Sequence, residues 1–196
     1  MTSKKPAQER SRLTVRSILE ASVQILMRTR KDGLNTRQVA ERAGVSVGSL
    51  YQYFKGSDSI LETLANEQID RDIRNIRETF TRTPGSAEAR LHAMFRRVIA
   101  EHRHNSPVRA VFFRKAFQLG ISEMVLEKLE AISQEIFAEL KTSLPLRPDL
   151  DEPLATHLLS RALFGIVQSV VMEAKELHDP EKYASEMTRM LVRYLT

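Results

Sequence analysis

The sequence predicts an all-α protein, and three observations support this fold class. Apolar residues recur at intervals of three and four through nearly the whole chain, which is the period of an amphipathic helix. Proline and glycine mark the breaks between these stretches, and no alternation of apolar and polar residues indicates a strand. With 196 residues, 42% of them hydrophobic, the chain can bury one sizeable core and a small second one.

The first helix is expected over residues 13–29. Its inward face follows the 3.6-residue period and consists of Val15, Ile18, Leu19, Ser22, Ile25 and Leu26. A helix with one such face can cover the back of the two short helices expected next.

These two short helices are predicted within residues 35–54. Thr36 is a good N-cap for the first of them. Gly44 can adopt the left-handed conformation that reverses the chain after a helix, and the Ser46 hydroxyl can then cap the second. The predicted geometry is a helix-turn-helix.

The second short helix has one apolar and one outward face. The inward residues are Val45, Leu50 and Phe54, and the outward residues are Val47, Ser49, Tyr51 and Tyr53. Because the outward face is almost free of acidic groups, it can approach phosphate.

Longer helices are expected in the rest of the chain. Ser57 or Asp58 can cap a long fourth helix, whose apolar stripe runs from Ile60 to Phe80 and which ends before Pro84. Further helical segments are expected at residues 87–104, 107–119, 122–144, 152–177 and 180–195.

Positive charge is concentrated at the N-terminal end. Residues 1–57 hold eleven basic and four acidic side chains, a formal charge of +7, whereas the remaining residues carry −2. Basic solvated helices give such a pattern too, but beside a helix-turn-helix it favours a polyanion as the partner of this end.

Composition argues against several other classes of protein. No apolar run approaches the roughly 20 residues that span a bilayer, and the first residues are too polar for a secretory signal, so no membrane partner is expected. The chain contains no cysteine, which excludes disulfides and thiolate metal sites and favours a cytoplasmic location.

The N-terminal third resembles the DNA-binding domain of TetR-family transcriptional regulators. The matching residues are Arg16–Ala21, Thr36, Val39–Ala40, Ala43–Ser46, Gly48, Leu50–Tyr51, Tyr53–Phe54 and Ile60–Leu61. The resemblance implies a homodimer of nine or so helices, with a basic arm at residues 1–11, a DNA-binding domain at 12–72 and a ligand-binding and dimerisation domain at 73–196. Its reading motif would be residues 35–54.

The same resemblance implies the residues that meet DNA. They are Thr36, Arg37, Ser46, Val47, Gly48, Ser49, Tyr51, Tyr53 and Lys55. Thr36 falls at a phosphate-contact position, and Arg37 is the best candidate for a guanine contact. The family commonly has a phosphate-binding lysine where this chain has Ser57, and Lys55 is the expected substitute.

Two groups of apolar residues are candidates for function in the C-terminal part. A ligand pocket is expected from Met94, Phe95, Val98, Phe112, Phe113, Phe117 and Met124, although an ordinary core explains any one of them. A dimer interface is expected from Phe164, Ile166, Val167, Val170, Val171, Met187, Met190 and Tyr194. The alternative for the second group is the central helix of a monomeric bundle.

These features together predict a ligand-responsive repressor associated with the bacterial nucleoid. It would bind a palindromic operator in double-stranded DNA as a dimer and be released by a hydrophobic or amphipathic small molecule. The alternatives are a ligand-independent architectural DNA-binding protein and, with little support, a helical enzyme, since no phosphate loop or nucleophile motif is present. No cofactor or metal is expected, because His102 and His104 lie two residues apart and so on nearly opposite sides of a helix.

Overall fold

The computed structural model describes residues 4–29, 33–104, 109, 111, 121–172 and 179–196. Its helices are α1 (Lys4–Thr29), α2 (Thr36–Ala43), α3 (Val47–Tyr53), α4 (Ser57–Arg82), α5 (Ala87–His104), α7 (Ile121–Ser143), α8 (Glu152–Met172) and α9 (Pro180–Leu195). No strand occurs within these ranges, and the predicted all-α fold is confirmed.

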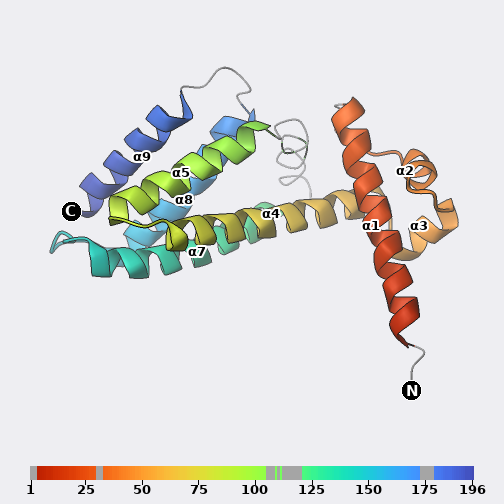
Figure 1. Cartoon of the computed structure of the whole chain (residues 1–196), viewed down its shortest axis with the longest axis horizontal. Helices are drawn as coiled ribbons and strands as arrows, with labels where there is room; N and C mark the ends of the chain where they lie inside the picture. Colours follow the sequence, from red (N-terminus) through yellow and green to blue (C-terminus); the bar gives the residue numbers. More distant parts are fainter. Residues whose placement is uncertain (1–3, 30–32, 105–108, 110, 112–120, 173–178) are drawn as a thin grey trace. The chain divides into compact units, whose positions relative to one another are not determined.

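The chain divides into two compact units, the first within residues 1–67 and 107–119 and the second within residues 68–106 and 120–196. In the first unit α1 packs against α2, and α2 against α3 (Figure 1). In the second unit α5 packs against α8 and α9, and α7 packs against α8. Helix α4 contributes its first eleven residues, Ser57–Glu67, to the first unit and the rest to the second.

Each unit has its own buried apolar residues. In the first unit they include Ile18, Leu26, Val39, Leu50, Phe54, Ile60 and Leu61. In the second unit they form one cluster that includes Phe80, Leu91, Met94, Phe95, Ile132, Ile136, Leu140, Leu159 and Leu163. Helical periodicity predicted most of these positions, because each helix has one face that must leave water.

The observed helices differ from the prediction mainly at the N-terminus. Helix α1 begins at Lys4 rather than near residue 13, so the segment expected to be a basic arm is part of that helix from Lys4 onward. No glycine or proline after Pro6 interrupts it, and Pro6 lies in the first turn, where its missing N–H removes no helical hydrogen bond. Helices α5 and α9 have the predicted bounds. The helix predicted at residues 107–119 lies almost wholly outside the described residues.

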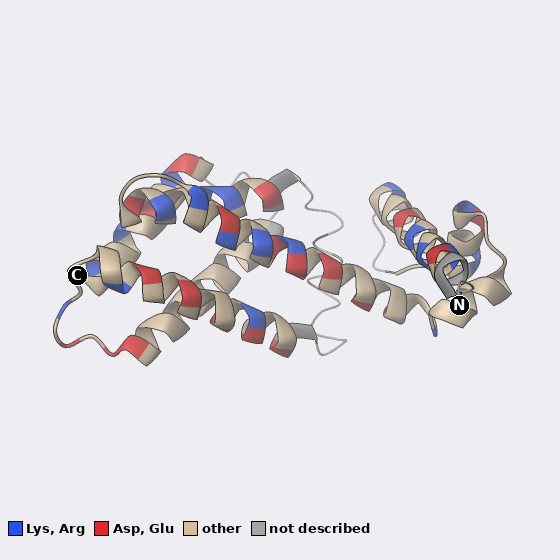
Figure 2. Cartoon of the chain, turned by 60° about the horizontal axis from the view of Figure 1, so that its bottom comes forward, with Lys and Arg blue, Asp and Glu red and all other residues tan. Residues whose placement is uncertain are grey.

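Polar contacts tie the second half of α4 to its neighbours in the second unit. This half carries both basic and acidic residues (Figure 2). Asn75 Nδ2 donates to both carboxylate oxygens of Glu101 on α5, at 3.0 and 3.1 Å. Arg77 Nε and Nη2 donate to Glu135 Oε2 and Oε1 on α7, at 2.6 and 2.8 Å. Helix α4 is therefore fixed to both α5 and α7 by side-chain hydrogen bonds.

The Arg77–Glu135 pair predicts a pH dependence of stability. The hydrogen bonds from Arg77 lower the pKa of the Glu135 carboxyl below its ordinary value of 4.5. Because the folded-state pKa is lowered, the stabilisation is fully present above pH 4.5 and is lost as pH falls through the folded-state pKa. Both side chains are about half exposed, so we expect Glu135→Gln to lower the free energy of unfolding at pH 7 by less than about 1 kcal/mol.

Urea unfolding of wild type and Glu135→Gln at pH 7 and pH 4 measures this difference, which should shrink at the lower pH. Glu78→Gln is a matched control, because Glu78 is paired with Arg82 at 3.7 Å within α4 alone. An equal difference in unfolding free energy between wild type and Glu135→Gln at both pH values would contradict the stabilising role of the Arg77–Glu135 pair.

Among the described residues, no helix is both long enough and apolar enough to cross a membrane.

Candidate nucleic-acid interface

The turn between α2 and α3 has the predicted geometry. Gly44 has φ of 70° and ψ of 29°, in the left-handed region, and its N–H donates to Glu41 O at 3.2 Å. Ser46 caps α3, because its Oγ accepts a hydrogen bond from Ser49 N at 3.0 Å. Both predictions from the sequence are confirmed.

The cap of α2 is not the predicted one. Asn35, not Thr36, is the N-cap, since Asn35 Oδ1 accepts hydrogen bonds from Arg37 N at 3.0 Å and Gln38 N at 3.2 Å. Thr36 is the first helical residue. Asparagine and threonine are both good N-caps, so composition alone did not choose between neighbouring positions. The Thr36 hydroxyl therefore does not cap α2 and can make another contact.

The two faces of α3 are separated as predicted, with one exception. Leu50 is fully buried and Phe54, just after α3, is 6% exposed, whereas Val45 is only half-buried. On the outward side Tyr51 is 53% exposed and Tyr53 is 37% exposed. Two aromatic side chains are therefore partly exposed on one face of α3, where a partner could cover them.

Side-chain contacts with α1 hold both short helices in place. Tyr53 Oη donates to Ser11 Oγ at 3.3 Å, and Arg42 Nε donates to Gln24 Oε1 at 2.6 Å. These contacts link α3 and α2 to the helix behind them. Helix α1 thus fixes the positions of α2 and α3, and with them the outward face of α3.

A polar depression of about 490 Å³ lies at the N-termini of α2 and α4. It is lined by Leu34, Asn35, Thr36, Arg37, Tyr51, Gly56 and Ser57. Thr36 Oγ1 and Tyr51 Oη are 3.3 Å apart across it. Three residues predicted to meet DNA thus come together from two helices, and no acidic side chain lines the depression.

The depression is suited to an anion. The N-terminal end of each helix carries partial positive charge, Arg37 adds a full charge, and Thr36, Tyr51 and Ser57 supply hydroxyl donors. Ser57, the first residue of α4, lines the depression, so a hydroxyl and helix-end amides are the donors at this point. Lys55 is exposed and does not line the depression.

The remaining predicted DNA-binding residues are accessible. Val47 and Gly48 are exposed, and Ser49 is half-buried. A Cβ added at Gly48 would meet only Ser46 Oγ, at 3.8 Å, which is ordinary contact distance. Nothing in the part of the chain that the structure describes therefore requires a glycine at this position.

The predicted ligand-binding residues fall into three groups. Met94 and Phe95 are fully buried and Val98 is 3% exposed, all within the apolar cluster of the second unit. Met124 is half-buried. Phe112, Phe113 and Phe117 lie outside the described residues.

The predicted dimer residues are also divided. Ile166 and Val170 are buried within their own chain, which leaves little of either to meet a second copy. Phe164, Val167, Met187 and Tyr194 are partly buried against the apolar cluster, Met190 is 58% exposed, and the side chain of Val171 is not described.

Sequence reasoning missed Leu154 and Leu158, which are 48% and 43% exposed and lie one turn apart on α8. Their four-residue spacing in the sequence was the available signal.

Comparison with known proteins places the N-terminal unit in a known family of domains. Residues 18–64 match the sequence model described as bacterial regulatory proteins, tetR family. The chain is 34% identical over 61 residues to the tetracycline repressor protein class D of Escherichia coli, a match that covers 31% of this chain and 28% of that protein. It therefore spans less than a third of the length of that curated relative.

Solved structures resemble the chain over nearly its full length. FadR of Bacillus subtilis, in complex with stearoyl-CoA, has a TM-score of 0.69 and 22% identity, with 92% of this chain and 98% of that one covered. FadR of Bacillus halodurans, a fatty acid degradation regulator, has a TM-score of 0.70 and 21% identity, with 91% and 94% covered. At these identities the likeness shows a shared fold.

Proposed function

We propose that this chain, whose residues 18–64 match the tetR family of bacterial regulatory proteins, is a ligand-responsive transcriptional repressor of that family. It would bind a palindromic operator as a homodimer on DNA in the bacterial cytoplasm. The observation that carries the proposal is the convergence of Thr36, Arg37 and Tyr51 on one acid-free depression beside the exposed face of α3.

The contacts with DNA divide into two kinds. Thr36, Tyr51, Ser57 and the first amides of α4 hold a backbone phosphate, which sets the position of the protein on the duplex. Val47 and Ser49 meet the edges of bases in the major groove, and Arg37 meets a guanine. In a dimer the two α3 helices would enter successive major grooves, about 34–36 Å apart.

Dimerisation is assigned to the outer faces of α8 and α9. The exposed Leu154, Leu158 and Met190 and the half-buried Phe164 and Met187 provide apolar surface there. Contact between two copies would remove this surface from water at about 25 cal/mol per Å². Ile166 and Val170 then support the interface from the core and do not contact the partner directly.

The proposed effector is a hydrophobic or amphipathic small molecule. The solved FadR of Bacillus subtilis holds stearoyl-CoA, and α5, α7 and α8 of this chain supply an apolar interior. Helix α4 has residues in both units, so a ligand that shifts α4 would change the spacing of the two reading helices. A coupling of about 1–3 kcal/mol between effector and operator is enough to regulate transcription.

Fluorescence anisotropy against a duplex taken from beside the gene tests the proposal. We expect saturable binding with two protomers per duplex, a steep loss of affinity with added salt, and release by stearoyl-CoA as the first effector probe. Equal affinity for an unrelated duplex would reject the operator. Tight operator binding that no acyl-CoA weakens would favour the ligand-independent architectural alternative.

Gly48 provides a prediction that separates DNA binding from folding. Gly48→Ala places a methyl group on an open helical surface, so we expect the free energy of unfolding to rise by about 0.5–1 kcal/mol. The same methyl group would obstruct close approach of α3 to the duplex, so we expect operator affinity to fall.

Urea unfolding and operator titration of the same preparation measure both effects of Gly48→Ala. Gln52→Ala, on the exposed surface of the same helix, is the control for a general change in helix propensity. Unchanged operator affinity in Gly48→Ala would remove this residue from the interface.

A further inference from the structure

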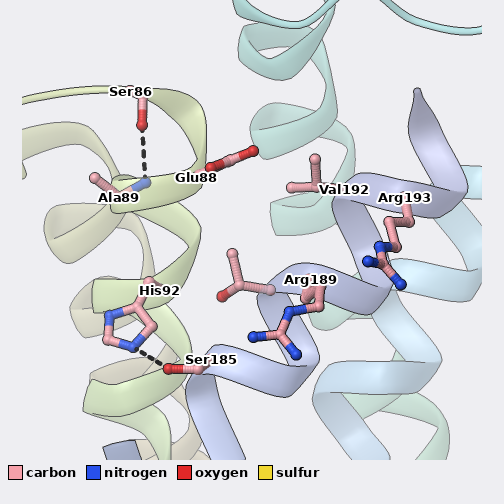
Figure 3. A pocket seen from close by; sticks show the side chains of 9 residues that line it. Ser86, Glu88, Ala89, His92, Ser185, Arg189, Val192 and Arg193 are labelled. Atoms are coloured by element: carbon pink, nitrogen blue, oxygen red, sulfur yellow. Dashed lines mark hydrogen bonds between the residues drawn. The ribbon is translucent and has the colours of Figure 1, made fainter. Parts of the chain in front are cut away.

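A second depression lies within the second unit. It is a groove of about 580 Å³ between the start of α5 and the second half of α9 (Figure 3). Its volume lies within the range of about 300–1,000 Å³ that small-molecule sites occupy. Both walls belong to one compact unit, so the groove is complete in a single chain.

The α9 wall carries two arginines. Arg189 and Arg193 are one helical turn apart, and both guanidinium groups extend from α9 along the groove (Figure 3). Arg189 Nη1 donates to Glu186, at 2.9 and 3.2 Å, which leaves its other N–H groups for a ligand. Arg193 makes no side-chain hydrogen bond or ion pair with the described part of the chain.

Polar contacts of His92 join the α5 wall to α9. His92 Nε2 lies 3.2 Å from Ser185 Oγ and 3.3 Å from Glu181 Oε1. Glu181 Oε2 also lies 3.9 Å from Arg96 Nε. Glu88 is the one acidic side chain that lines the groove, against two arginines. Glu186, outside the lining, offsets part of the charge of Arg189, so Arg193 is the main positive charge that an anion would meet in the groove.

The groove also has an apolar part. Ala89 on α5 and Val192 on α9 also line it. Guanidinium groups recognise carboxylate and phosphate through paired N–H donors, and the apolar side chains suit a hydrocarbon body. An inorganic ion would fill only a small part of the volume.

We propose that this groove binds a small organic oxyanion, with its carboxylate or phosphate at Arg189 and Arg193 and its apolar body against Ala89 and Val192. Such a ligand would bridge α5 and α9. The site is separate from the apolar interior that the proposed effector would occupy, and its test needs no DNA, so either proposal can fail without the other.

Saturation-transfer NMR on the full chain tests the site with four probes: phenyl phosphate, benzoate, benzamide and inorganic phosphate. We expect saturable binding of phenyl phosphate or benzoate and none of benzamide, which has the same ring without the charge. Comparison of the two anions identifies the preferred oxyanion. Binding of inorganic phosphate is measured by how well it displaces the bound organic probe. It should bind more weakly than the organic anions because it has no apolar body.

Variants of the groove complete the test. Arg189→Gln with Arg193→Gln should weaken the bound anion by roughly tenfold or more, whereas Arg74→Gln, an exposed arginine on α4, should not. Glu88→Gln removes the opposing charge and should strengthen binding by about threefold. All the altered side chains are exposed, so thermal unfolding should stay near that of wild type.

Binding of benzamide as tight as that of benzoate, or affinity retained in the double arginine variant, would overturn the proposal. Equal binding of inorganic and phenyl phosphate would overturn the role of Ala89 and Val192.

Discussion

The double variant Arg37→Ala, Tyr51→Ala is expected to lose at least roughly 100-fold in operator affinity. A base-contacting arginine is worth about 1–3 kcal/mol, and loss of Tyr51 removes a hydroxyl from the proposed phosphate site. Both side chains occur twice in a dimer, so the losses apply to each half-site. Anisotropy titration at fixed salt measures the change.

The single variants separate the two roles. Tyr51→Phe removes only the hydroxyl that lies 3.3 Å from Thr36, so it should weaken binding about equally for every sequence. Arg37→Ala should relax specificity at one base pair of each half-site and lessen the salt dependence. Arg82→Ala, which removes an exposed arginine at the end of α4, is the matched control for charge. Full affinity in the double variant would refute the interface described above.

Phe95→Ala is expected to destabilise the second unit by about 3–5 kcal/mol, the largest effect on folding predicted here. Phe95 is fully buried within the apolar cluster, so truncation leaves a cavity that its neighbours only partly fill. A loss of this size is a large share of the roughly 5–15 kcal/mol by which domains are stable.

Urea unfolding at one fixed protein concentration measures the effect, because dimer dissociation would make the midpoint depend on concentration. Phe95→Leu, which keeps most of the apolar volume, should lose distinctly less. A change below about 1 kcal/mol for Phe95→Ala would mean that the ring borders a cavity, as a ligand-pocket residue would.

Local features of the helix-turn-helix were readable from the sequence. Gly44 in the left-handed region and Ser46 as the cap of α3 depend on the conformational preferences of single residues and their near neighbours. The bounds of α5 and α9 follow from the period of their apolar residues and from flanking breakers. Where two good caps stood side by side, at Asn35 and Thr36, propensity did not decide.

Residues that share a function but come from different elements were harder to predict. The depression at the N-termini of α2 and α4 joins Thr36 to Tyr51 and Ser57, and only the packing of the first unit brings these three together. Likewise, periodicity marks Phe95 and Leu158 alike as apolar helical residues, but one is fully buried and the other is 43% exposed.

The sequence by itself thus determined the helices, the turn between α2 and α3 and the match of residues 18–64 to the tetR family, because each rests on short-range backbone preference or on a motif within one stretch of chain. The tertiary structure alone decided which apolar side chains form the core and which residues line each depression. It also brought the arginines of α9 opposite His92 of α5, about a hundred residues earlier in the chain. These outcomes depend on which helix faces meet, and many arrangements of amphipathic helices satisfy the same periodicity.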